Sequence, residues 1–322
     1  MRTLITGAAG FIGSHLADSL LIAGAEVIGV DSITDYYAAN VKRRNLQFLH
    51  GRPGWHFLEQ RVGEISSAQL DGVDVVFHLA AQPGVRTSWQ EFDKYLDLNL
   101  AETARLAASV AGSDVQTVVF ASSSSVYGDL AQYPARESDD ARPRSPYGVT
   151  KLAGEKLWDA YVLAHPMQVA ALRFFTVYGP GQRPDMATQR LVRAALDRST
   201  FTLFGDGEQR RDFTFVTDVV NACIAVARCK SLLTNHVNVF NVGGTGDVSM
   251  RQLVDLVEAS TGRSIDIEWQ PAQLGDVRRT GADVTRIRAL TGWAPRTTIE
   301  AGVRLHVDFE RLTTVDSWRG DR

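Results

Sequence analysis

Tyr147 and Lys151 are the side chains best placed to do chemistry, because they stand four residues apart just after Ser145 and Pro146. Serine favours the N-cap of a helix and proline its first position, so a helix is predicted to begin here. Side chains four apart lie on one helix face, where an ammonium lowers the pKa of a phenol from about 10 toward that of a general base. The same spacing is common on solvated helix faces, so the surrounding sequence must decide between a base and a surface pair.

A glycine-rich turn near the N-terminus predicts a dinucleotide site. A β-like run at residues 3–6 leads into Gly7, Gly10 and Gly13, a helical pattern follows to residue 23, and a strand at 25–30 ends in Asp31. Glycines let the backbone approach a pyrophosphate at a helix N-terminus, and the acid accepts hydrogen bonds from the adenosine ribose. The spacing differs from the GxGxxG fingerprint, so the order strand, turn, helix, strand, acid carries the prediction.

The acid Asp31 also favours NAD over NADP, because a carboxylate repels a 2′-phosphate. Three basic residues, Lys42, Arg43 and Arg44, follow it. We interpret them as the solvated face of a helix rather than as phosphate ligands.

Strands and helices then alternate along the chain. Strands are expected at 55–58, 73–79, 115–120 and 169–174, and helices at 95–111 and 147–164. This alternation predicts an α/β fold with a Rossmann-like, doubly wound parallel sheet, in which ligands bind at the carboxyl ends of the strands. The glycine turn, Asp31, the loop after His78, the serine run after residue 121 and the loop at 173–183 should therefore share one edge.

Beyond residue 176 the pattern loosens into a smaller mixed α/β region that we expect to cap this edge. Expected elements are helices at 186–198, 217–227, 249–260, 284–290 and 299–312, and strands at 201–204, 213–216, 237–241 and 265–269. Some of these pieces, around 213–241, are expected to return to the large sheet.

Composition excludes several classes of function. The 322 residues carry a net charge of −3, which gives no basic surface for nucleic acid. No apolar run approaches the ~20 residues that span a bilayer, and because glycines break the N-terminal segment we do not expect it to be a signal peptide. Cys223 and Cys229 match no metal or redox spacing, so we expect no metal and two buried free thiols in a cytoplasmic protein.

Taken together, these motifs resemble the extended short-chain dehydrogenase/reductase family, and more narrowly its NAD-dependent nucleotide-sugar epimerases and dehydratases. The resemblance covers residues 6 to about 295 and is carried by residues 6–13, 31, 78–81, 122–128, 147–151 and 205–213. It implies that Tyr147 is the base or acid on the sugar 4-hydroxyl, that Lys151 binds the nicotinamide ribose and lowers the tyrosine pKa, and that Ser123 bonds the same oxygen. The cofactor residues that it implies are Gly7, Ala9, Gly10, Phe11, Ile12, Gly13, Asp31, Val62, Leu79, Ala80, Ala81, Tyr147, Lys151 and Phe174.

The resemblance also narrows the reaction. Dehydratases and UDP-glucuronate decarboxylases carry acids where this chain has Ser124 and Ser125, whereas the run from Arg173 to Ala187 is very similar to UDP-glucuronate 4-epimerases. In those enzymes the equivalents of Thr176 and Arg183 help to hold the sugar carboxylate. The substrate residues that the resemblance implies are Arg86, Ser123, Ser124, Ser125, Tyr147, Thr176, Arg183, Arg211 and Asp276.

Some positions depart from the family pattern, and others are expected to have only a structural role. Arg61 stands where an Asp usually contacts the adenine, and Gln273 stands where UDP-galactose epimerases place an Arg. His78 is expected to bond locally, and Ser122 to be no more than loop. Asn99 is either a satisfied buried amide or a helix-kinking residue, and Asp212 is expected to pair with Arg210 or Arg211.

The leading hypothesis is NAD-dependent 4-epimerisation of UDP-glucuronate. The alternatives are a UDP-glucose/UDP-galactose 4-epimerase, a decarboxylase or dehydratase, and a non-catalytic NAD-binding regulator. The resemblance implies an NAD-binding domain at 1–175, a UDP-sugar-binding domain at 176–322, and a homodimer formed through the two helices between His78 and Val115.

Overall fold

The computed structural model describes residues 1–272 and 277–319 and contains a seven-stranded sheet of order β10-β6-β5-β4-β1-β2-β3. Every neighbouring pair in this sheet is parallel. Its strands are β1 (Arg2–Thr6), β2 (Glu26–Asp31), β3 (Trp55–Glu59), β4 (Val75–His78), β5 (Thr117–Ser123), β6 (Gln168–Phe174) and β10 (Asn238–Val242). The predicted Rossmann-like α/β fold is confirmed.

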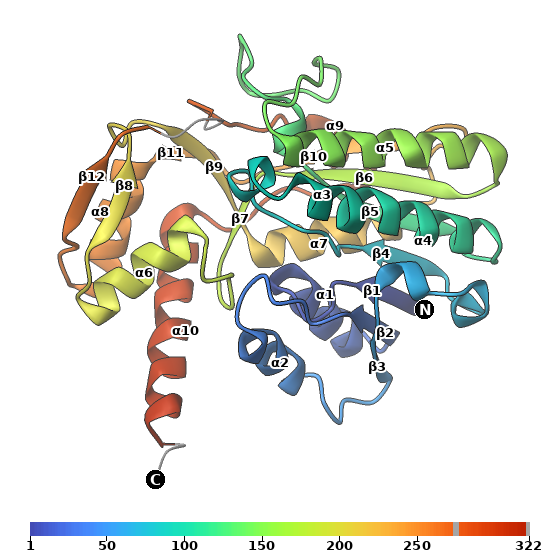
Figure 1. Cartoon of the computed structure of the whole chain (residues 1–322), viewed down its shortest axis with the longest axis horizontal. Helices are drawn as coiled ribbons and strands as arrows, with labels where there is room; N and C mark the ends of the chain where they lie inside the picture. Colours follow the sequence, from blue (N-terminus) through green and yellow to red (C-terminus); the bar gives the residue numbers. More distant parts are fainter. Residues whose placement is uncertain (273–276, 320–322) are drawn as a thin grey trace.

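Helices cover both faces of this sheet (Figure 1). One face carries α1 (Phe11–Ile22), α2 (Ala39–Gln47) and α7 (Val216–Ala227), with α9 (Thr285–Thr291) against β10; the other carries α3 (Phe92–Tyr95), α4 (Glu102–Ala111) and α5 (Pro146–Ala164). All residues of β4 and β5 are consequently buried, which is why both strands read as continuous apolar or small-residue runs rather than as alternating ones.

The helical run before β5 is not the single regular helix expected at 95–111. It is α3, then a π-helical segment (Leu96–Ala101), then α4. Asn99 lies in the π segment and is buried; its Oδ1 accepts from the Gln82 amide at 2.6 Å, and its Nδ2 donates to the Gln82 carbonyl at 3.0 Å and to Thr150 Oγ1 at 3.1 Å. The interpretation of Asn99 as a satisfied buried amide is confirmed, and the π-helical segment that holds it interrupts the regular α-helix.

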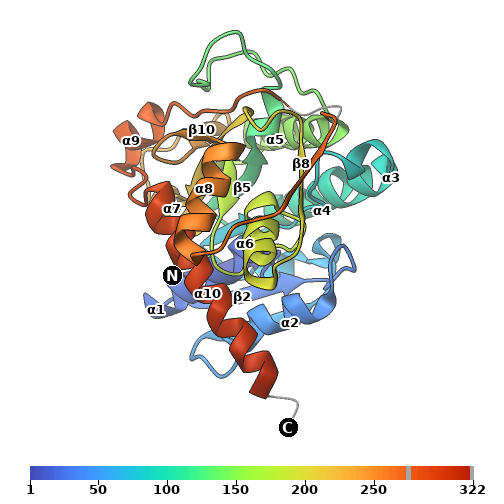
Figure 2. The same ribbon diagram turned by 90° about the vertical axis from the view of Figure 1, so that its left-hand side faces the viewer.

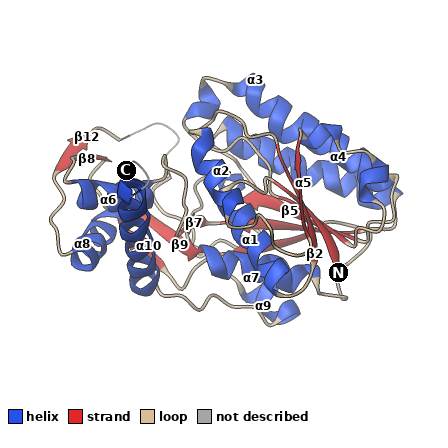
Figure 3. Cartoon of the chain, turned by 90° about the horizontal axis from the view of Figure 1, so that it is seen from below, coloured by secondary structure: helices blue, strands red, loops and turns tan. Residues whose placement is uncertain are grey.

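The C-terminal region lies at the end of the sheet where the strands finish (Figures 1 and 3). It holds a three-stranded sheet of β7 (Thr176–Tyr178), β9 (Arg210–Phe215) and β11 (Asp247–Ser249), and a pair of β8 (Phe201–Phe204) with β12 (Ile267–Gln270). Its helices are α6 (Ala187–Asp197), α8 (Met250–Thr261) and α10 (Ile299–Arg319), seen from this side in Figure 2. They enclose an apolar core of their own around Tyr178, Leu253 and Val303.

Two strands were not foreseen, and part of the 213–241 stretch returns to the large sheet. The strands β7 and β11, of three residues each, are too short to leave a pattern, whereas α2 was expected only as a charged helix face at 42–44, without bounds. Strand β10 pairs with β6, and α7 packs against α1, whereas β9 stays in the small sheet. The short helical turns are Val62–Glu64, Ser67–Leu70, Thr87–Trp89 and Ser124–Val126.

Within residues 1–272 and 277–319, none of the helices has the length and apolar character needed to cross a bilayer, and we find no cluster of acidic, histidine or cysteine side chains able to hold a metal. Cys223 is buried and Cys229 half-buried, and both thiols are free.

Candidate active site

The strand register brings the predicted site residues to one edge. Thr6 pairs with His78, His78 with Phe120, and Ser123 with Phe174, so the loops that follow these strands leave the sheet side by side. A cavity of about 420 Å³ lies there. The predicted residues that line it are Gly7, Gly10, Phe11, Ile12, Gly13, Asp31, Val62, Leu79, Ala80, Ala81, Ser123, Ser124, Ser125, Tyr147, Lys151, Phe174, Thr176 and Arg183.

The glycine turn has the shape required to cradle a dinucleotide. Gly7 has φ +73°, and a Cβ there would lie 2.9 Å from the Ala80 amide nitrogen. A Cβ on Gly13 would lie 2.1 Å from the Gly7 carbonyl oxygen, so only glycine lets α1 begin so close to the turn. No side chain caps the start of α1, which leaves its first amides and the positive end of its dipole for an anionic ligand.

Asp31 ends β2 at the cavity wall, and backbone amides fix its carboxylate. Its Oδ1 accepts from Ile33 at 2.8 Å and its Oδ2 from Ala9 at 3.2 Å. Ala9 is thus fully buried behind the wall, and the structure does not bring it to the cavity as predicted.

Lys42 corrects the interpretation of the basic run as a solvated face. Its side chain is buried, donates to Thr34 Oγ1 at 3.0 Å and pairs with Asp31. Arg43 is exposed, as expected, and pairs with Glu59. The difference arises because α2 turns one face toward the loop that follows β2, which a nine-residue helix of low hydropathy does not reveal.

The Tyr147–Lys151 pair sits at the start of α5, where Ser145 Oγ accepts from the Gly148 amide at 3.1 Å. The structure contradicts one expectation: burial raises the pKa of the Tyr147 phenol, against the opposing effects of a hydrogen bond from Ser123 and the charge of Arg183. The Lys151 ammonium donates to the Ala121 carbonyl at 2.8 Å and lies 6.0 Å from the Tyr147 ring centre. Burial lowers the pKa of Lys151 to about 8, opposed by Glu155.

Glu155 is a residue that sequence reasoning missed. Its carboxylate is buried and accepts two bonds from Arg173, at 2.9 and 2.7 Å, and one from Ser122 Oγ at 2.5 Å. Ser122 is therefore more than a loop residue, because with Arg173 and Glu155 it ties β5 and β6 to α5 at the strand position before Ser123. The spacing could have revealed it, since Glu155 follows Lys151 by four residues and shares its helix face.

His78 bonds locally, as expected. One ring nitrogen lies 2.8 Å from Thr6 Oγ1 and the other 2.9 Å from Thr103 Oγ1. Burial, with a smaller effect of the Lys151 charge, lowers its pKa to about 3. A neutral imidazole with a hydrogen-bond partner at each ring nitrogen is suited to fixing β1 against β4 rather than to proton transfer.

Arg61 and Glu102 shape the end of the cavity where an adenine would be read. The Arg61 guanidinium donates to Glu102 Oε1 at 2.9 Å and pairs with Asp97, and Glu102 also accepts from the Gly63 amide. Glu102, on α4, was not foreseen because it lies some 40 residues from the strand whose loop it supports. It brings a buried carboxylate to the place where Arg61 replaces an acid.

A second cavity, of about 190 Å³, adjoins the first, because Ser124, Ser125 and Thr176 line both. Arg86 and Arg211 line only this second cavity, together with the unforeseen Arg144. The Arg86 guanidinium lies 4.4 Å from the Phe204 ring centre. Asp276, the remaining predicted substrate residue, lies outside the described residues, as does Gln273.

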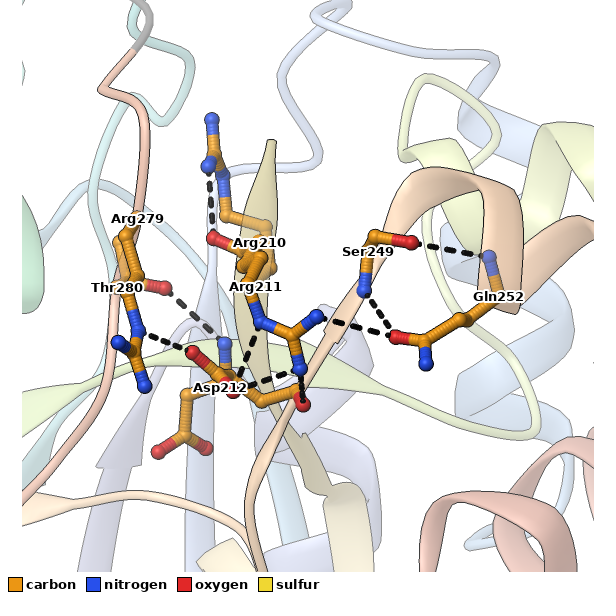
Figure 4. Close-up of polar contacts among 8 residues, drawn as sticks. Arg210, Arg211, Asp212, Ser249, Gln252, Arg279 and Thr280 are labelled. Carbon is orange, nitrogen blue, oxygen red and sulfur yellow. Dashed lines mark hydrogen bonds and ion pairs between the residues drawn. The ribbon is translucent and has the colours of Figure 1, made fainter. Parts of the chain in front are cut away.

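The neighbours of Arg211 fix the strand that carries it (Figure 4). Arg210 donates to the Asp247 carboxylate at 3.0 Å and to Gln252 at 3.3 Å, and Arg279 also pairs with Asp247. Asp212 pairs with neither arginine, contrary to expectation, but accepts from the Gly244 and Ala282 amides at 2.5 and 3.0 Å. Burial raises the pKa of this carboxyl to about 6.

Tyr36 and Tyr37 also line the main cavity and were missed. They follow Asp31 by five and six residues, and aromatic residues after the ribose-binding acid could have suggested a wall. Burial raises the pKa of both phenols to about 12, so they are neutral groups that shape the site.

Comparison with known proteins agrees with this arrangement. The family model described as the NAD dependent epimerase/dehydratase family matches residues 3–243. An uncharacterized UDP-glucose epimerase, YtcB, of Bacillus subtilis is 40% identical over 312 residues, covering 96% of this chain and 98% of the relative. A probable UDP-glucuronate 4-epimerase of Rhizobium meliloti is 34% identical, covering 96% of both. Among solved structures, UDP-glucuronic acid 4-epimerase from Bacillus cereus in complex with UDP-glucuronic acid and NAD has a TM-score of 0.93 at 35% identity, covering 97% of this chain and 100% of that one.

Proposed function

Because the chain belongs to the NAD-dependent epimerase/dehydratase family, whose cofactor is NAD, we propose that it is a UDP-glucuronate 4-epimerase, interconverting UDP-glucuronate and UDP-galacturonate. The observation that carries the proposal is the set of groups around the space next to Tyr147. Three hydroxyls (Ser124, Ser125 and Thr176) and the Arg183 guanidinium line one cavity, and neither serine position offers the acid that a decarboxylase or dehydratase uses. Relatives and solved structures that act on or bind UDP-sugars support the coarser assignment, a UDP-sugar epimerase.

The residues present fit NAD. The glycine cradle and the α1 N-terminus would hold its pyrophosphate, Asp31 its adenosine ribose, and the backbone at Val62 its adenine; Leu79, Ala80, Ala81 and Phe174 would pack around it. When bound, NAD supplies reversible acceptance of a hydride from sugar C4. We propose that residues 1–175, with α7 and β10, hold the cofactor and that most of 176–322 holds the UDP-sugar.

Tyr147 takes the proton of the sugar 4-hydroxyl, and Ser123 donates a hydrogen bond to that oxygen as it becomes a ketone. Lys151 stays anchored on Ala121 at the end of β5, from where its ammonium reaches the ribose. The 4-ketosugar then swings about its link to UDP, and Tyr147 returns the proton to the oxygen on the opposite ring face. Arg86 and Arg211 hold the diphosphate in the adjoining cavity while the sugar turns.

With UDP-glucuronate as substrate, the 4-keto intermediate can lose CO₂, and we propose that the hydroxyl groups of the cavity help to prevent this. With a ketone at C4, the carboxylate on C5 belongs to a β-keto acid and leaves as CO₂ when its bond aligns with the carbonyl π system. Ser124, Ser125, Thr176 and Arg183 hold that bond near the carbonyl plane through charge-assisted hydrogen bonds. Small donors on several loops can do so in both ring orientations.

The test is to incubate the purified protein with UDP-glucuronate, UDP-glucose and dTDP-glucose and to identify the products by mass and NMR. A product of unchanged mass, with inverted C4, from UDP-glucuronate supports the proposal. Turnover of UDP-glucose alone would support the UDP-galactose alternative, and loss of CO₂ or water from any substrate would indicate a lyase.

We also propose a homodimer through the helical run from α3 to α4. Phe92 and Leu96 are 37 and 38% exposed in this run, and Trp89, in the turn just before α3, is 58% exposed. Val149 is exposed on α5, which contacts α3. A second copy that covers this apolar patch would remove it from water.

A further inference from the structure

Arg183, the residue expected to bind the sugar carboxylate, is already paired with the carboxylate of Asp185. Arg183 Nε donates to Asp185 Oδ1 at 3.0 Å and Arg183 Nη2 donates to Asp185 Oδ2 at 2.9 Å. The pair is bidentate, the geometry in which a guanidinium and a carboxylate bind most strongly. Burial opposes the ionisation of Asp185, but the hydrogen bonds and charge of Arg183 outweigh it and hold the pKa of this carboxyl below its usual range.

This pairing leaves Nη1 of the guanidinium for a ligand, because Nη2 also donates to Met186 Sδ at 3.4 Å. Nη1 of Arg183 donates to no residue that the structure describes, and Arg183 lines the main cavity, close enough to Tyr147 for its charge to lower the phenol pKa. Asp185 does not line the cavity. The carboxylate therefore lies outside the cavity, and its side chain is 40% exposed.

Tyr36 holds this pair from the cofactor side. Its hydroxyl donates to Asp185 Oδ2 at 3.3 Å, and the Arg183 guanidinium lies 5.6 Å from its ring centre. A Cβ on Gly84 would lie 2.7 Å from the Tyr36 hydroxyl, so the loop after β4 closes on the same point. Three loops, after β2, β4 and β7, thus converge on the Arg183–Asp185 pair and fix its direction.

We propose that Asp185 determines how strongly the site discriminates between an acidic and a neutral hexose, by neutralising Arg183 and holding its Nε–Nη2 edge. This inference rests on the proposed function, since it concerns the sugar of the same site. A lone guanidinium facing a neutral sugar would be half-buried without a counter-charge, whereas the Arg183–Asp185 pair is balanced before any ligand binds. For an acidic sugar, the arginine must serve two carboxylates, which weakens the advantage of the acid.

The inference predicts that removing the charge of Asp185 sharpens selectivity for the acid. Binding of UDP-glucuronate and UDP-glucose is measured by calorimetry on NAD-loaded protein carrying Tyr147→Phe, so that no turnover is required. Asp185→Asn should raise the ratio of the UDP-glucose Kd to the UDP-glucuronate Kd about tenfold, since two like charges across one guanidinium repel at a partly exposed site. Asp185→Glu, which keeps the charge, and Asp140→Asn, which removes an exposed charge paired with Arg142, should each leave the ratio within about threefold.

An unchanged or reduced ratio in Asp185→Asn would overturn the inference. So would equal weakening of both ligands, which is what a merely structural role in the loop produces. The epimerase activity of the unsubstituted protein is measured separately. A shifted Kd ratio without turnover would refute the proposed reaction and support the role of Asp185. Turnover without a shifted Kd ratio would support the proposed reaction and refute the role of Asp185. Failure of both ligands to bind would refute both the reaction and the role.

Discussion

The ammonium nitrogen of Lys42 lies 3.5 Å from Oδ1 of Asp31, and each of the two side chains is only 8% exposed. The acid that we propose to bind the adenosine ribose is therefore one half of a buried ion pair. Because Ala9 and Ile33 also donate to this carboxylate, the protein fixes its direction before a nucleotide binds. Strand β2 sets the position of Asp31, and Lys42 on α2 provides its counter-ion.

Lys42→Met should destabilise the fold by about 3–5 kcal/mol, since it leaves a buried carboxylate without its counter-ion. Arg43→Met is the matched control on the same helix: its ion pair with Glu59 is about half exposed and should contribute less than about 1 kcal/mol. Urea unfolding of both variants measures the difference. Equal losses would contradict a structural role for the buried pair.

Ser123→Ala should move the rising limb of the pH profile of kcat/KM to higher pH. The hydrogen bond from Ser123 lowers the pKa of the Tyr147 phenol, so its removal lets the raising effect of burial act with less opposition. A phenol of higher pKa needs a higher pH to ionise and act as base. Ser113→Ala, on the loop before β5, is the control and should not move the limb. A fall in kcat with the limb in place would show that Ser123 acts on the ketone oxygen alone.

Lys151→Met should stabilise the NAD-free protein at pH 7 while abolishing activity. Burial lowers the folded-state pKa of Lys151 to about 8, below its unfolded value of about 10.4, so holding the ammonium costs ~3 kcal/mol below pH 8. Between pH 8 and about 10.4 the unfolded chain binds more protons, and the stability contributed by Lys151 rises with pH. The free energy of unfolding of both proteins is measured from pH 7 to 10. The extra stability of Lys151→Met should decrease as the pH rises. The exposed Lys156→Met should show no such trend.

Arg183→Ala should convert part of the substrate into a UDP-pentose and CO₂. Without the guanidinium, three hydroxyls alone restrain the carboxylate bond, and the 4-keto intermediate loses CO₂ whenever that bond leaves the carbonyl plane. Mass spectrometry of the products gives the fraction. The exposed Arg142→Ala serves as control and should release none. If Arg183→Ala kept its preference for the acid sugar and released no pentose, the proposed restraint would be wrong.

Leu96→Glu should dissociate the proposed dimer. Leu96 is 38% exposed in the π segment beside Phe92, and a carboxylate there would be buried without a partner in an apolar interface. Sedimentation of the variant should give the mass of one chain, while Leu305→Glu, at an exposed position on α10, leaves the mass unchanged. A monomeric unsubstituted protein would refute the dimer directly.

Local sequence alone determined the scaffold of the site. Gly7 and Gly13 are required because a Cβ at either position meets backbone, and backbone cannot move aside. Ser145 and Pro146 begin α5 as their capping chemistry predicts, which fixes Tyr147 and Lys151 one turn apart. Once the strands are parallel, their carboxyl ends must share an edge, so the order of strands and loops was enough to collect Asp31, Ser123 and Thr176 around one cavity.

Only the tertiary structure decided how these groups are charged and held. Lys42 was interpreted as part of a solvated face, and no role was foreseen for Glu155, Asp185 or Glu102. Each forms an ion pair through contacts that depend on which helix face meets which loop. The pKa of Tyr147 moved against the expectation from its lysine neighbour, because desolvation depends on everything packed around the phenol, whereas spacing reports only a neighbour on the same helix. Spacing along the chain thus specified which groups meet; burial and long-range partners decided what those groups can do.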